Sequence, residues 1–492
     1  MSKPIISVVG TLGNYSSNIP TLSKILWSNS TFIADEYLDA NSSPAMPISS
    51  ASNAPYVFSF LDEAASQPQF RVSLSNYSYT LGATGSSTYW VYDPTGTGWS
   101  LQGQPSPMNP PYNPYGFANI TYSSTPYLVV GDYDSANNNG GTLCLVSMSG
   151  TGSYGTVASI GIANQTSGTY TYQAHVQDVY VAGSRIFALV IYSNILSTAP
   201  ANLQYISSEV REYKLITDAN GNVAFDPVGS AVSISKNAVC LVPYSSGSNN
   251  YLFIPCIGGM QNYGPPNNGA DSSLSLVELT TTGIGPEAKP YIGGAASTLH
   301  DFRGMAIASD GTAYILTGDY AANTSMSWSL YKDNAATLIG KASGTIPLSF
   351  RIQSDVNTSA YFWALGICQG GADEYLAFAK GSVNNPSAYV AYDELHLLKV
   401  GQTWSPTNDA NNVIIPSNST TGGTAGLTQA TANGFAINSM DISVPGGVPT
   451  PPTPLRSAAP PARAAIHRSH AAMAAEVREK EKKIVEALLG LG

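Results

Sequence analysis

Adjacent acidic residues recur along the chain, and the phrase Ala-Asp-Glu-Tyr-Leu occurs twice. Asp35 and Glu36 lie in its first copy, and Asp373 and Glu374 lie in its second. A glycosidase needs two carboxyl groups about 5–9.5 Å apart, one of them acting as a general acid. Neighbouring residues on a β-strand point to opposite faces, so one dipeptide cannot supply both groups to one site. These four residues are the acid/base candidates if the protein is an enzyme, and solvated turn or edge positions are the simpler interpretation.

Oxygen ligands of the type that Ca²⁺ prefers occur in the segment GDYDSANNNGG, which contains Asp132 and Asp134. Ala136 stands where an EF-hand-like loop needs Asp or Asn, and the closing Glu of such a loop is absent. We therefore expect a hairpin loop without a metal ion. His and Cys residues do not occur at the spacings of zinc sites, and we expect no cofactor.

Two histidines each have an aspartate nearby: His175 with Asp178, and His300 with Asp301. A catalytic His–Asp pair would also need a nucleophile, and no serine lies in a nucleophile-elbow sequence. We expect these pairs to make structural hydrogen bonds between repeated units. His396, in a strand-like segment, is expected to be structural too.

Aromatic residues in a loop could bind a sugar, because flat rings present apolar faces to pyranose C–H groups. The segment MNPPYNPYGFANITY supplies three candidates, Tyr112, Tyr115 and Phe117. Since aromatic residues make up 10% of the chain, this pattern by itself is weak.

All four cysteines lie in segments that resemble buried strands. They are Cys144, Cys240, Cys256 and Cys368. Buried free thiols behave as small apolar side chains, and we expect no disulfide and no metal in the folded body.

The net charge of −10 is unevenly distributed. The chain from Pro445 onward holds 7 of the 21 basic residues and only 4 of the 31 acidic ones, so the preceding body is more acidic than the whole. Such a body lacks the basic surface that nucleic acids or anionic membranes require. No apolar run approaches the ~18 residues of a membrane span. The amino-terminal segment does not resemble a secretory signal.

A repeat of about 61 residues organises the body. Each unit predicts a short strand, a tight turn, a strongly apolar strand, a polar loop and a further strand. Landmarks of the last strand are Trp90, Leu145, Tyr213, Leu276, Leu330 and Leu397. Antiparallel sheets repeated at this interval favour a β-propeller of six or seven blades over a series of β-sandwiches of about 100 residues each.

The two ends of the body are expected to pair with each other. The segment PIISVVGTLG near the amino terminus and the segment GFAINSMDISV before the tail both have strand-like patterns. Their pairing would close the ring and leave no exposed strand edge there.

The carboxy-terminal part differs in character from residues 1–445, which form the predicted propeller body. Residues 446–463 are rich in proline and predict an extended linker. Residues 464–490 predict an amphipathic helix whose apolar residues lie on one face. This face, expected to dock on a protein partner or a larger assembly, consists of Ile466, Met473, Val477, Ile484 and Leu488.

The main interpretation of these patterns is a non-enzymatic surface or assembly protein, a virion or extracellular component anchored through the carboxy-terminal helix. The abundance of Ser, Thr, Asn and Tyr suggests a surface made polar by hydroxyls and amides, and it is the basis for the expected localisation. The alternative is a carbohydrate-binding or carbohydrate-cleaving propeller, a lectin or a glycosidase. A partner of that kind would be a glycan.

Overall fold

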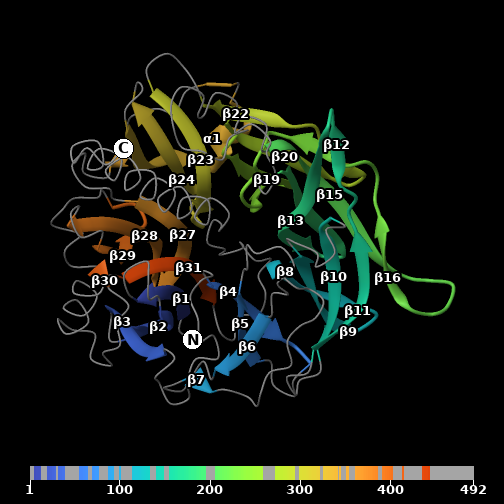
Figure 1. Cartoon of the computed structure of the whole chain (residues 1–492), viewed down its shortest axis with the longest axis horizontal. Coiled ribbons are helices and arrows are strands. Elements are labelled where there is room, and N and C mark those ends of the chain that lie inside the picture. The colour runs from blue at the N-terminus through green and yellow to red at the C-terminus, as the bar shows by residue number, and fades with distance from the viewer. Residues whose placement is uncertain are drawn as a thin grey trace, which may run out of the picture.

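The computed structural model describes the following residues: 5–12, 19–28, 31–38, 55–64, 69–76, 87–92, 99–100, 114–132, 140–148, 154–194, 205–258, 272–293, 298–321, 325–341, 343–344, 351–353, 361–385, 390–402, 413–414 and 435–443. These residues form 31 β-strands and one short helix, so the fold is nearly all-β. The strands belong to six mainly antiparallel sheets, which are arranged around a common centre in a propeller-like ring (Figure 1).

The first half of the ring begins with four strands from both ends of the body, β31 (Phe435–Ser443), β1 (Ile5–Leu12), β2 (Ile19–Ser28) and β3 (Thr31–Leu38). The next sheet contains β4 (Pro55–Asp62), β5 (Gln69–Asn76), β6 (Ser87–Tyr92) and β7 (Trp99–Ser100). The third contains β8 (Pro114–Tyr122), β9 (Thr125–Asp132), β10 (Thr142–Met148) and β11 (Tyr154–Gly161).

Two larger sheets follow. The first contains β12 (Gln165–Ser167), β13 (Tyr170–Ala182), β14 (Arg185–Ser193), β15 (Tyr205–Thr217), β16 (Val223–Pro227) and β17 (Val232–Ile234). The second contains β18 (Val242–Ser246), β19 (Asn249–Cys256), β20 (Ser273–Thr280), β21 (Gly283–Ile284) and β22 (Ala288–Ile292).

The last two groups return to the beginning of the ring. One sheet contains β23 (Thr298–Ile307), β24 (Thr312–Ala321), β25 (Ser325–Asn334) and β26 (Arg351–Gln353). The final group contains β27 (Tyr361–Gly370), β28 (Asp373–Asn385), β29 (Val390–Lys399) and β30 (Val413–Ile414). The helix α1 (Ala335–Ile339) follows β25, and the side chain of Asn334 caps it by accepting a hydrogen bond from the Thr337 amide at 3.3 Å.

The expected closure of the ring is confirmed. Strand β31 pairs antiparallel with β1, from Ile5 opposite Ser443 to Leu12 opposite Phe435. A single parallel pair, Tyr392 opposite Phe435, also joins β29 to β31, so the first and last strand groups form one continuous sheet. The two ends of the body therefore lie side by side (Figure 1).

Because neighbouring strands are antiparallel, the connections between them lie alternately on the two opposite sides of the ring, which we call its two ends. At one end, tight turns join the first two strands of a unit, as at residues 123–124, 183–184 and 371–372. Gly183 and Gly371 have φ of +62° and +65° there, which glycine adopts without strain. We call this the hairpin-turn end. At the opposite end, the loop end, β9, β14 and β19 finish and longer stretches of sequence separate them from the next strand.

Tyrosine fills much of the space between the sheets. The largest side chains with less than 2% exposure are Tyr172, Tyr192, Tyr213, Tyr291, Tyr314 and Tyr331. The suggestion that tyrosine mainly makes the surface polar is therefore wrong for these residues. A tyrosine ring buries a large apolar area, and its hydroxyl can bind a partner at the edge of the core.

The four cysteines are buried and free, as the sequence predicted. Burial raises the pKa of the Cys256 thiol to about 12, so this thiol is not reactive in the folded protein. Among the described residues, no helix is both long and apolar enough to cross a membrane. The predicted linker and carboxy-terminal helix, residues 446–490, lie outside the described residues.

Candidate functional site

The loop end of the ring carries buried polar side chains. On β13, His175 is only 5% exposed, and its Nε2 lies 2.9 Å from the hydroxyl oxygen of Ser193. Ser193 ends β14 and is itself buried. This hydrogen bond is structural, but it joins β13 and β14 of one sheet, whereas the sequence suggested a bond between two repeated units. The side chains of His300 and Asp301 lie outside the described part of the chain.

Asp178 binds the protein backbone. One of its carboxylate oxygens accepts from its neighbour Val179 and the other from the Leu241 amide, each at 2.8 Å. Gln177, at a bulge in the same strand, donates to the carbonyl of Val239 at 3.3 Å. Together these two side chains connect β13 to the segment that leads into β18. We assign Asp178 a structural role because both of its oxygens accept backbone bonds.

Of the three aromatic candidates for a sugar platform, only Phe117 has a side chain among the described residues. Phe117 is only 4% exposed and stacks on Phe60, with ring centroids 5.9 Å apart, so its face is not available to a sugar. The side chain of Tyr115 and the whole of Tyr112 lie outside the described residues. Burial decides against Phe117, because β8 packs against the preceding sheet.

Of the two weak calcium candidates, only Asp132 belongs to the described residues. Asp132 is buried at the end of β9 with 1% exposure, while Asp134 lies outside the described residues. In the ranges given above, no group of three or more His, Cys, Asp and Glu side chains is placed to hold a metal ion.

The two acidic residues of the phrase near residue 373 point in opposite directions, as strand geometry predicts. Asp373 and Glu374 begin β28 at the hairpin-turn end and point to opposite faces of their sheet. The Glu374 carboxylate accepts from the Ser309 amide at 2.9 Å and from its hydroxyl at 2.7 Å, and so joins the turn of the preceding sheet. Asp373 binds the ammonium group of Lys399 at 2.7 Å. Asp35 and Glu36 lie in β3, and their side chains are not described.

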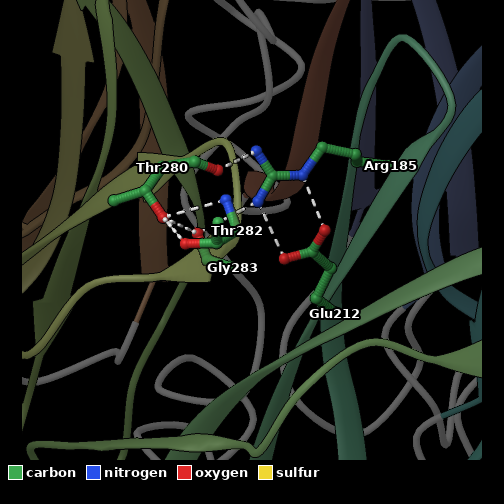
Figure 2. A network of polar contacts seen from close by, with 5 residues as sticks. All are labelled: Arg185, Glu212, Thr280, Thr282 and Gly283. Carbon is green, nitrogen blue, oxygen red and sulfur yellow. Dashed lines mark hydrogen bonds and ion pairs between the residues drawn. The ribbon is translucent and has the colours of Figure 1, made fainter.

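A second polar network at the hairpin-turn end is structural (Figure 2). The Arg185 guanidinium binds both carboxylate oxygens of Glu212, at 2.6 and 2.8 Å. It also donates to the carbonyl oxygens of Thr280, at 2.7 Å, and Gly283, at 3.1 Å. Arg185 therefore connects β14 and β15 to the β20–β21 turn of the next sheet through four hydrogen bonds to protein groups.

Three half-buried aromatic side chains gather where the ring closes. Trp27 and Phe32 come from β2 and β3, and Tyr375 comes from β28. The ring centroids are 4.7 Å apart for Trp27 and Phe32, 5.4 Å for Trp27 and Tyr375, and 5.2 Å for Phe32 and Tyr375. Each residue keeps part of its surface in contact with solvent. We call these three residues, together with Asp373 and Lys399, the seam platform.

Two glycines allow the indole to lie against the β27–β28 turn. A methyl group at Gly370 would lie 2.6 Å from Cε2 of Tyr375 and 2.8 Å from Cε3 of Trp27. Such distances are too short for any larger residue without a shift of the rings. Gly371 lies beside the indole nitrogen edge of Trp27. Trp27 is therefore held in place by backbone on one side.

The polar pair completes the seam platform. Lys399 lies opposite Tyr375 in the β28–β29 ladder, and Asp373 lies two residues before Tyr375 on the same strand face. The side chains of Lys399 and Asp373 are 39% and 43% exposed. The hydrogen bond that the Lys399 ammonium donates to Asp373 raises the pKa of that ammonium group. Burial, and then the Asp373 carboxylate, raises the pKa of the Tyr375 phenol.

This arrangement offers flat apolar rings beside an exposed donor and an exposed acceptor. A sugar ring has the matching chemistry, since it presents C–H groups on its faces and hydroxyls around its rim. The sequence pointed to Asp373 but not to Trp27, Phe32, Tyr375 or Lys399. Tyr375 belongs to the second copy of the repeated acidic phrase, and this was the one signal in the sequence that could have identified it. Trp27 is far from that phrase in sequence, so nothing linked the two residues.

Comparisons with known proteins give only distant likenesses. No family model matches the chain, and no curated protein sequence matches it. An ulvan lyase from a polysaccharide lyase family, bound to a GlcA–Rha3S chain, is 10% identical with a TM-score of 0.42, over 82% of this chain and 94% of the lyase. An α-L-arabinanase of Penicillium chrysogenum with arabinobiose is 12% identical with a TM-score of 0.33, over 64% of this chain and 90% of the arabinanase. An α-L-arabinofuranosidase of Fusarium graminearum with an iminosugar inhibitor is 11% identical with a TM-score of 0.34, over 65% and 91%.

These comparisons contradict the main interpretation of the sequence. A non-enzymatic surface or assembly protein was expected, whereas the solved structures to which the chain is similar are carbohydrate-cleaving enzymes. The alternative interpretation, a carbohydrate-binding or carbohydrate-cleaving propeller, agrees with them better. The composition that suggested a virion or extracellular surface does not distinguish the two interpretations, because glycan-binding surfaces are also rich in hydroxyls and amides.

Proposed function

We propose that the protein is a carbohydrate-active β-propeller that binds a glycan on the seam platform. The observation that carries this proposal is the placement of Trp27 and Tyr375, with centroids 5.4 Å apart, beside the exposed Asp373–Lys399 pair. A sugar ring would stack on the aromatic side chains while its hydroxyls bind the carboxylate and the ammonium group. Charge-assisted hydrogen bonds of this kind are stronger than neutral ones.

The propeller itself would have seven blades. In support, the eight-stranded sheet divides into two groups of four, one from β31 and β1–β3 and the other from β27–β30. The five remaining sheets supply one blade each. In this arrangement the carboxy-terminal strand β31 and the amino-terminal strands share a blade, and the seam platform lies between that blade and the last one.

The proposal is tested by measuring the affinity of the full-length protein for a panel of soluble polysaccharides. Trp27→Ala should weaken glycan binding about tenfold or more, which corresponds to about 1.4 kcal/mol. Tyr180→Ala is the matched control, because Tyr180 is a half-buried ring at the same end that stacks on Phe187 with centroids 6.1 Å apart, away from the seam platform. Its glycan affinity should equal that of the wild type.

A second variant separates binding from packing, since Trp27→Ala also removes buried apolar area. Lys399→Met replaces a side chain that is 39% exposed and should leave the thermal midpoint nearly unchanged while it weakens glycan binding. Wild-type protein that binds no glycan, or variants that bind as tightly as wild type, would refute the proposal. Cleavage of the same panel is followed by reducing ends for hydrolysis and by ultraviolet absorbance for the unsaturated ends of elimination.

A further inference from the structure

The seam platform contains one carboxylate, Asp373, and one ammonium group, Lys399. Lys399 is already bonded to Asp373 at 2.7 Å, so its charge is balanced. The neighbouring Glu374 points to the opposite face of the sheet and binds Ser309. The platform therefore carries no net charge, in a chain whose net charge is −10.

This charge distribution discriminates between classes of glycan. A uronate or sulfate group would have to displace Asp373 from Lys399, and it would approach against the negative net charge of the whole chain. A neutral sugar meets no such cost. Two adjacent hydroxyls of a neutral sugar match the pair as it stands, because one can donate to Asp373 while the other accepts from Lys399.

We propose that the seam platform selects an uncharged glycan, an inference that rests on the proposed carbohydrate binding. The parts of the aromatic rings that remain in contact with solvent supply affinity without regard to charge, and the Asp373–Lys399 pair supplies a donor and an acceptor for hydroxyls. Binding of such a ligand should depend little on ionic strength, because no net charge is neutralised when it binds.

The first test compares full-length protein with uncharged xylan, mannan and glucan and with anionic polygalacturonate and a sulfated galactan. We expect an uncharged polymer to bind and its affinity to stay constant between about 20 mM and about 500 mM NaCl, a range over which the screening length shortens severalfold. Binding of anionic polymers alone, or an affinity for the uncharged polymer that falls steeply with salt, would overturn the inference while leaving carbohydrate binding intact. Failure of every polymer to bind would instead refute the proposed function.

The second test removes the negative partner. Asp373→Asn keeps a hydrogen-bonding side chain but leaves the Lys399 charge unbalanced, and it should raise the affinity for an anionic glycan about two- to fivefold, the usual effect of one exposed charge. Asp226→Asn is the matched control, because Asp226 also pairs with an exposed lysine, Lys214, at 3.1 Å, on strands away from the platform. Equal affinities of both variants and of the wild type for the anionic glycan would count against charge selection by Asp373.

Discussion

At the scale of single residues, partners decide which polar groups remain available to a ligand. Asp178 accepts two backbone bonds and Glu374 holds a turn, so both side chains stabilise contacts between sheets. Asp373 and Lys399 bind each other but stay exposed, so they can also bind a ligand. Asp178, Glu374 and Asp373 are all carboxylates, and only their surroundings differ.

The tyrosine hydroxyls in the core give a prediction for alkaline pH. Burial, and then the hydrogen bond to Glu209 at 2.6 Å, raises the pKa of Tyr192 from 10.0 to about 12. Because the folded-state pKa lies above the unfolded one, the contribution of Tyr192 to stability is complete below about pH 10 and is lost as the pH rises toward 12. The difference at 295 nm between the alkaline titrations of wild type and Tyr192→Phe should therefore have its midpoint well above 10. A midpoint at the ordinary value of tyrosine would contradict this prediction.

At the scale of elements, buried contacts between neighbouring sheets hold the ring together, in addition to the ladders within each sheet. Leu143, Tyr172 and Val190, from three strands of two sheets, belong to one buried cluster. Polar side chains add specific links at the hairpin-turn end. Arg185 connects its sheet to the next (Figure 2), and Glu374 connects its sheet to the preceding one.

We expect Arg185→Met to destabilise the protein by about 3 kcal/mol or more, because it leaves a buried carboxylate without its partner. The Glu212 side chain is only 3% exposed, so water cannot replace the guanidinium. The free energy of unfolding in a denaturant titration measures the effect. The double variant Arg185→Met/Glu212→Gln should recover much of the loss, since it removes the uncompensated charge. If the double variant is as unstable as the single one, packing over Phe187, and not the charge pair, is the main contribution of Arg185.

At the scale of the whole molecule, closure depends on strands from both ends of the body. Strand β31 ends at Ser443, and it pairs along the full length of β1. Without it, β1 would be an exposed edge with unsatisfied hydrogen-bonding groups. The seam platform takes residues from β2 and β3 of the first strand group and from β28 and β29 of the last group. A ligand bound there would therefore contact both groups.

Two truncations test the predicted division of the chain. Removal of residues 446–492 keeps β31, and we expect the thermal midpoint of the body to stay within a few degrees of the full-length value. Removal of residues 435–492 also deletes β31, and we expect a much lower midpoint and aggregation through the exposed edge of β1. Thermal melts and light scattering measure both outcomes. A large loss of stability in the longer variant would show that the tail belongs to the folded body.

The sequence determined the strand-rich fold, the repeat and the pairing of its two ends, because hydrophobic alternation and turn residues act over short distances along the chain. It also indicated that the cysteines are buried and that Asp373 and Glu374 point apart. Only the tertiary structure brought Trp27 beside Tyr375 and buried Phe117, since these contacts join strands from different repeats. A functional site between two sheets depends on which sheet faces pack against each other. The hydrophobic pattern of one strand shows which of its faces is buried, but it does not show which other sheet covers that face. That is why the aromatic candidates chosen by loop position were wrong for Phe117, while the seam platform went unrecognised.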